Sequence, residues 1–241
     1  MHSIGILAHS ADGAALCFLE MCRAAERRLG AHEHPEITLS ILPMGPVLDA
    51  WERMDLATIV AYLGRTADRL AAAGCAFFVC PDNTAHIALE EPGTALPLPG
   101  LHIADIVAQR ARTDARTRVG LLGTRWTMEG PVYARALSRA GIEMRVPPDA
   151  QRARVDAIIF DELCRGIMTT SSRDEYVRII EGLRDDGCGA VILGCTEIPL
   201  LVTPEVSPLP TLDSTRLLAQ EAVAVAAGDR PLPHWRGGPD M

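Results

Sequence analysis

Gly187-Cys-Gly-Ala-Val-Ile-Leu-Gly-Cys-Thr-Glu-Ile-Pro-Leu-Leu201 is the stretch that decides the fold of this chain. Its residues 190–193 form a short apolar run without polar alternation, which is typical of a central strand of a parallel sheet, covered on both faces. Cys195 follows just past the end of this strand. Because open α/β sheets bind ligands beyond the carboxyl ends of their strands, the sequence indicates a ligand site at this thiol.

A second copy of the stretch lies earlier in the chain, at a constant offset of 113 residues. Residues 74–86 read Gly-Cys-Ala-Phe-Phe-Val-Cys-Pro-Asp-Asn-Thr-Ala-His, so that Gly74-Cys75 corresponds to Gly187-Cys188 and Asp82 to Cys195. A period this long favours a duplicated lobe, because solenoid repeats are much shorter. We therefore expect an α/β fold of two pseudo-symmetric, doubly wound lobes with mostly parallel sheets and the active site between them.

Strands and helices alternate in the same way in both halves of the chain. The returning last helix assigns residues 1–114 plus 213–241 to the first lobe and 115–212 to the second. A tail rich in Pro and Gly, 228–241, is expected to lie on the surface or to fray. The expected strands are 4–7, 37–42, 76–80, 118–122, 143–146 and 190–193, and the expected helices are 14–29, 55–73, 85–90, one ending near 112, 130–140, 152–186 with a break, and 214–227.

Composition limits the partners of this chain. The formal charge of −8 and the absence of basic runs argue against nucleic acid or an anionic membrane as partner. No apolar run approaches the roughly 18 residues of a membrane span, and no basic leader precedes the first strand, so we expect a cytoplasmic protein. The seven cysteines lie largely in or beside apolar strands, which favours reduced thiols.

Asp82 and Cys195 are the candidate catalytic residues. Two related lobes would bring their strand ends face to face, with one of these groups on each side of a substrate. A racemase removes a proton from one face of a carbon and returns it on the other, which requires one acid/base group per face. Cys195 could equally be a buried core cysteine, but the glycine before it and the polar Thr-Glu after it favour a functional thiol.

Four segments together resemble the aspartate/glutamate racemase family, the cofactor-independent group that includes hydantoin racemases, maleate isomerases and arylmalonate decarboxylases. The resemblance covers roughly residues 3–226 and implies two α/β lobes and a PLP-independent amino-acid racemase. This chain has Asp82 where the racemases carry their first catalytic cysteine, directly before Asn-Thr. The segments are Gly194-Cys-Thr-Glu-Ile-Pro-Leu-Leu201, Pro81-Asp-Asn-Thr-Ala-His86, Gly123-Thr-Arg-Trp-Thr-Met128 and Asp213-Ser-Thr215.

Polar residues near the expected strand ends are candidates for binding a substrate carboxylate, since helix amino termini favour anions. Thr and Asn side chains also cap helices, and that alternative stays open for each of them. The candidates are His9, Ser10, Asn83, Thr84, Thr124, Thr127, Thr196 and Glu197.

We expect neither a cofactor nor a metal. The chain has no lysine, because all 23 basic residues are arginines, so a pyridoxal phosphate Schiff base is excluded. The expected function is an amino-acid racemase or epimerase. Two alternatives remain: a single-thiol decarboxylase or cis-trans isomerase of a small carboxylate, and a non-catalytic carboxylate binder. The apolar helix at 214–227 leads us to expect a homodimer.

Overall fold

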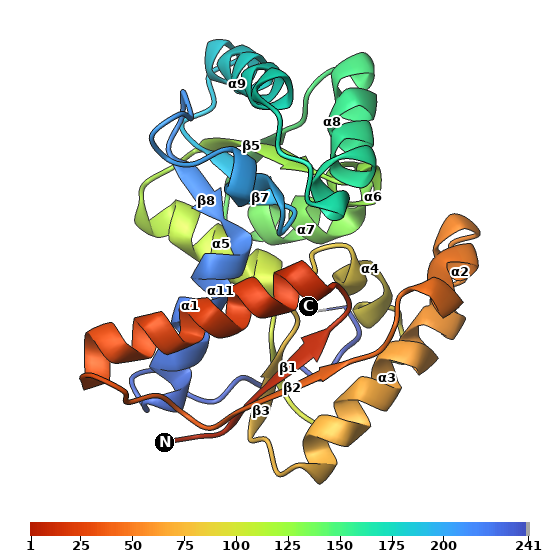
Figure 1. Ribbon diagram of the computed structural model, residues 1–241, viewed down its shortest axis with the longest axis vertical. Coiled ribbons are helices and arrows are strands. Elements are labelled where there is room, and N and C mark those ends of the chain that lie inside the picture. Colours follow the sequence, from red (N-terminus) through yellow and green to blue (C-terminus); the bar gives the residue numbers. More distant parts are fainter. Residues whose placement is uncertain (240–241) are drawn as a thin grey trace. The chain divides into compact units, whose positions relative to one another are not determined.

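The computed structural model describes residues 1–239, which fold into two compact units, Met1–Ile103 with the segment from Thr215, and Ala104–Ser214 (Figure 1). The first boundary falls at the start of helix α5 (Ile103–Thr113), which the sequence analysis placed in the first lobe. Arg139 of α7 (Pro131–Arg139) donates to Asp105 of α5 at 2.5 Å, and this ion pair ties α5 to the second unit.

The first unit is built on a four-stranded parallel sheet of order β2-β1-β3-β4. Helices α1 (Ala11–Leu29) and α3 (Leu56–Ala72) lie on opposite faces of β1 and β2, as right-handed crossovers in this strand order require (Figure 1). The strands are β1 (Ile4–Ala8), β2 (Ile37–Ile41), β3 (Phe77–Val79) and β4 (Gly100–Leu101), and the shorter helices are η1 (Gly45–Val47), α2 (Leu48–Glu52) and α4 (Ala85–Leu89).

The second unit has the same sheet, in the order β6-β5-β7-β8 and again parallel throughout. These two sheets confirm the α/β fold expected from the sequence. The strands are β5 (Arg118–Gly123), β6 (Glu143–Arg145), β7 (Val191–Gly194) and β8 (Thr211–Asp213), and the remaining helices are α6 (Arg125–Glu129), α8 (Asp149–Asp161), η2 (Leu163–Arg165), α9 (Thr170–Asp185), α10 (Ile198–Leu201) and α11 (Ser214–Ala226).

The repeated Gly-Cys pair has a structural reason. Gly74 and Gly187 follow α3 and α9 with φ of +81° and +84°, a conformation that glycine adopts without a Cβ clash. The amides of Cys75 and Cys188 then donate to the carbonyls of Leu70 and Leu183, at 3.1 and 3.0 Å. Together with the glycine N–H bonds to Ala71 and Arg184, this is the Schellman motif, which ends each helix and directs the chain into the next strand.

A second repeated glycine sets how closely these helices approach the sheets. A Cβ at Gly5 in β1 would lie 3.0 Å from the Leu70 side chain, and one at Gly120 in β5 would lie 2.7 Å from that of Leu183. The two helices therefore pack directly on strand backbone. Such close packing leaves the central strands fully buried, as their unbroken apolar sequences predict.

Two expectations concern the end of the chain. Most of residues 228–239 are exposed, as expected of a surface tail, but Trp235 in this segment packs against the core of the first unit; residues 240–241 of the expected tail lie outside the described residues. Among the apolar residues of α11, which were expected to offer surface for a dimer, Leu218, Ala222, Val223 and Val225 are at most 2% exposed within the chain, and Leu217 is partly exposed. The homodimer stays a prediction. Within residues 1–239, no helix has the length and apolar character needed to cross a membrane.

Candidate active site

Cys195 is the first residue after β7, and its thiol has a carboxylate partner. The residue is partly exposed, and its Sγ donates to Oε2 of Glu197 at 2.9 Å; the Glu197 side chain is almost wholly buried. Desolvation and the neighbouring Glu197 carboxylate raise the pKa of the Cys195 thiol well above its usual range. The resting group is therefore a protonated thiol, which can donate a proton.

Two threonines after β5 lie at the same sheet edge, since β5 and β7 are paired and parallel. Thr124 begins α6, and its Oγ1 accepts the Thr127 N–H at 3.2 Å while the two hydroxyls lie 3.1 Å apart. Thr124 is thus a helix cap, the alternative that its residue type left open. Only glycine fits where these turns meet, because a Cβ at Gly123 would lie 2.9 Å from the Gly194 carbonyl oxygen.

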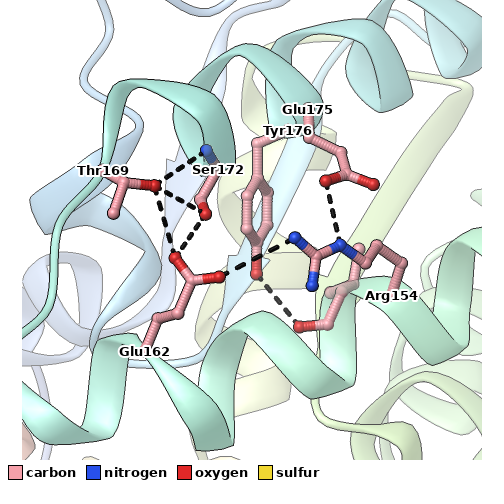
Figure 2. A network of polar contacts seen from close by, with 7 residues as sticks. Arg154, Glu162, Thr169, Ser172, Glu175 and Tyr176 are labelled. Carbon is pink, nitrogen blue, oxygen red and sulfur yellow. Dashed lines mark hydrogen bonds and ion pairs between the residues drawn. The ribbon is translucent and has the colours of Figure 1, made fainter.

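A polar network joins helix α9 to α8 and the turn that follows it (Figure 2). Glu162 accepts hydrogen bonds from Ser172 and Thr169, and Arg154 bridges Glu162 and Glu175. Tyr176, fully buried on α9, donates to the Val155 carbonyl at 3.4 Å. Burial first, and then the charge of a Cys195 thiolate, raises the Tyr176 pKa. The tyrosine hydroxyl therefore stays neutral close to the thiol.

Asp82 lies after β3 in the first unit, at the start of the turn that leads into α4. Its Oδ1 accepts the Ala85 N–H at 3.0 Å, while its carbonyl oxygen is bound by Nδ1 of His86 at 2.9 Å. Asn83 is buried and Thr84 partly so, in the same turn. Cys80 is fully buried, and burial raises the pKa of its thiol, so it is a core residue and no replacement for a catalytic cysteine.

His9 and Ser10 follow β1, which pairs with β3 in parallel, so they share a sheet edge with the Asp82 turn. His9 is 4% exposed, and its Nε2 accepts the indole N–H of Trp51 at 2.9 Å. Because an indole N–H can only donate, Nε2 of His9 is the acceptor in this bond. Ser10 is the N-cap residue of α1 but makes no side-chain capping bond.

The candidate residues thus form two sets, one at the carboxyl edge of each sheet. Sequence reasoning missed Trp51 and Tyr176. Trp51 belongs to a connection that carries no motif, and Tyr176 occupies an ordinary apolar position of a helix. Within residues 1–239, no group of three His, Cys, Asp or Glu side chains is arranged to hold a metal ion. The first set is His9, Ser10, Asp82, Asn83 and Thr84, and the second is Thr124, Thr127, Cys195, Thr196 and Glu197.

Fold and site define a class: an α/β protein of two four-stranded parallel sheets in which a thiol–carboxylate pair follows a central strand. The chain belongs to the Asp/Glu/Hydantoin racemase family, whose family model matches residues 14–222. This match confirms the resemblance found in the sequence.

Individual relatives agree with this assignment. The structure of a candidate Asp/Glu racemase from Yersinia pestis is 31% identical, with a TM-score of 0.82, covering 94% of this chain and 100% of that one. Glutamate racemase of Syntrophus aciditrophicus is 31% identical over 146 residues, which are 60% of this chain but only 53% of that enzyme. The broad specificity amino-acid racemase RacX of Bacillus subtilis is 26% identical over 161 residues, 66% of this chain and 68% of that protein.

Proposed function

We propose that this protein is a cofactor-independent amino-acid racemase or epimerase, in which Cys195 and Asp82 act on opposite faces of the substrate α-carbon. The observation that carries the proposal is the Cys195–Glu197 pair, in which a protonated thiol donates to a buried carboxylate at the carboxyl end of a central strand. Asp82 follows the corresponding strand of the other sheet. Family membership and the names of the relatives support the reaction class.

The proposed step moves two protons and no other atom. The Asp82 carboxylate takes the α-proton, and the electron pair of the broken C–H bond delocalises into the substrate carboxylate. The Cys195 thiol then gives its proton to the opposite face, which leaves a thiolate and a protonated Asp82. Amides and hydroxyls of residues such as Asn83, Thr84 and Thr196 would stabilise the charge that develops on the substrate carboxylate. The reverse reaction uses the same groups with their protonation states exchanged.

One observation favours a second candidate, a single-thiol reaction. Oδ1 of Asp82 already accepts the Ala85 N–H, so this carboxylate serves as a cap of its own turn. If this bond kept Asp82 from acting as a base, Cys195 would do the proton chemistry alone, as in a decarboxylase or a cis-trans isomerase of a small carboxylate. Asp82 would then bind or polarise the substrate.

A screen of amino acids and small dicarboxylates in heavy water separates these functions. A racemase incorporates solvent deuterium at the α-carbon and interconverts the enantiomers. A decarboxylase incorporates deuterium only with release of carbon dioxide, a cis-trans isomerase changes alkene geometry, and a carboxylate binder leaves every compound unchanged. Racemisation without deuterium incorporation would contradict the proposed proton transfer.

Three variants assign the roles within the active enzyme. Cys195→Ala should lower kcat by at least about a hundredfold, since positioned acid/base groups contribute about 10²–10⁴. Asp82→Asn removes the base, but its amide oxygen can still cap Ala85, so a loss of similar size would assign proton transfer to the carboxylate. Full racemase activity in Asp82→Asn would leave capping as the role of residue 82. Asp82→Cys should keep or raise racemisation, because a thiol there can take the same proton.

A further inference from the structure

The segment Trp235–Gly238, here called the strap, returns to the first unit and lies against α4 and β4. Gly237 has a φ of +87°, and a Cβ there would lie 2.6 Å from the Thr94 side chain, so only glycine fits at this position of the segment. The strap also covers the free edge of β4, the last strand of the sheet. Its backbone bonds are Gly238 N–H to Leu89 at 2.9 Å, Leu96 N–H to Arg236 at 2.7 Å and Gly100 N–H to Trp235 at 2.8 Å.

Trp235 is the centre of a ring cluster under α4. Its indole stacks on the His86 ring, with centroids 5.8 Å apart and planes 12° apart. An edge contact to His102, with centroids 4.9 Å apart, and a tilted contact to Phe78, with centroids 6.0 Å apart, complete the cluster. The indole N–H donates to the Gly238 carbonyl at 2.9 Å, which fixes the ring relative to the strap backbone. A flat ring held in this way determines the plane of the imidazole that it covers.

His86 carries this constraint to the candidate catalytic turn. Nδ1 must donate to the Asp82 carbonyl, because a carbonyl is only an acceptor, and Nε2 accepts the Ile103 N–H at 3.4 Å. His86 is fully buried, and burial together with neighbouring His102 lowers its pKa to about 3, so the ring stays neutral. One imidazole therefore joins the Asp82 backbone to the first turn of α5.

We propose that Trp235 is a positioning residue, which acts through the His86 ring to hold the turn that carries the Asp82 carboxylate. The strap binds the carboxyl end of α4 at Leu89, and His86 binds its amino-terminal turn. The strap thus contacts the carboxyl end of this short helix directly and its amino-terminal turn through the His86 ring. The consequence for catalysis rests on the proposed racemase function; the consequence for the turn does not.

Amide hydrogen exchange tests the turn without any substrate. The Ala85 N–H reports directly on its bond to Asp82 Oδ1. Trp235→Ala should speed Ala85 exchange by about tenfold or more, as local opening becomes easier, while amides of β7 keep their wild-type rates. His234→Ala is the matched control, because His234 neighbours Trp235 in the sequence and is exposed.

Further variants keep this test decisive. Trp235→Leu retains an apolar side chain against the core without the flat ring, and it serves if Trp235→Ala fails to fold; it too should speed Ala85 exchange. Trp235→Phe can still stack on His86 and should restore slow exchange. Wild-type Ala85 exchange in folded Trp235→Ala or Trp235→Leu would overturn the proposal.

Kinetics test the catalytic consequence. Trp235→Ala should lower kcat about 10- to 100-fold with a smaller change in KM, because displacing a reacting group by about 1 Å costs up to about 10² in rate. Trp235→Phe should recover most of kcat. Faster Ala85 exchange with unchanged kcat would overturn the positioning role while the racemase stands. If the wild-type chain were inactive but the variants showed the expected exchange pattern, the racemase proposal would be removed. The conclusion that Trp235 holds the Asp82 turn would stand.

Discussion

At the scale of single residues, burial and the neighbouring Glu197 carboxylate together raise the pKa of the Cys195 thiol. Replacing the carboxylate in Glu197→Gln removes its charge, which should lower the raised pKa of Cys195. More thiolate then forms at a given pH. Alkylation of Cys195 by iodoacetamide, followed residue by residue with mass spectrometry, should therefore begin at lower pH than in the wild-type protein.

Glu205→Gln is the control for this change. Glu205 is an exposed carboxylate of the same unit, so its replacement should leave the pH profile of Cys195 unchanged. A wild-type profile in Glu197→Gln would show that desolvation alone raises the pKa of the thiol.

At the scale of elements, the two Schellman turns determine where α3 and α9 end. Gly74→Ala should lower the free energy of unfolding by about 1 kcal/mol, because alanine is strained at the positive φ of this position although nothing lies within 4 Å of its Cβ. Gly64→Ala, in the interior of α3 with equal space around it, should raise stability by about 0.5–1 kcal/mol. Urea denaturation measures both. Equal effects of the two substitutions would exclude the turn conformation as the reason for Gly74.

At the scale of the whole molecule, stability should fall in acid because of a buried neutral histidine. The His86 pKa is lowered from 6.5 to about 3, so the unfolded chain binds a proton between these values and the folded chain does not. The free energy of unfolding is largely unaffected by His86 above pH 6.5 and falls as the pH is lowered below that value. At pH 5 the loss of stability amounts to about 2 kcal/mol.

Melting temperatures at pH 7, 6 and 5 measure this loss. His86→Gln should be less stable at pH 7, since its ring contacts are gone, but its stability should change less between pH 7 and 5. Parallel declines of the wild type and the variant would assign the acid sensitivity to other groups.

The repeated α/β arrangement could be predicted from the sequence alone, since hydrophobic periodicity and the glycine turns are patterns of residues close together in the chain. The sequence also placed Cys195 and Asp82 correctly after the ends of central strands, where open α/β sheets bind their ligands, and their catalytic roles stay predictions. Only the tertiary structure decided that Glu197 contacts the thiol, that Trp51 binds His9 and that the tail packs as a strap. These contacts depend on how side chains are placed in space. Trp235 and His86, for example, lie far apart in the sequence, so no local sequence pattern predicts that they are in contact.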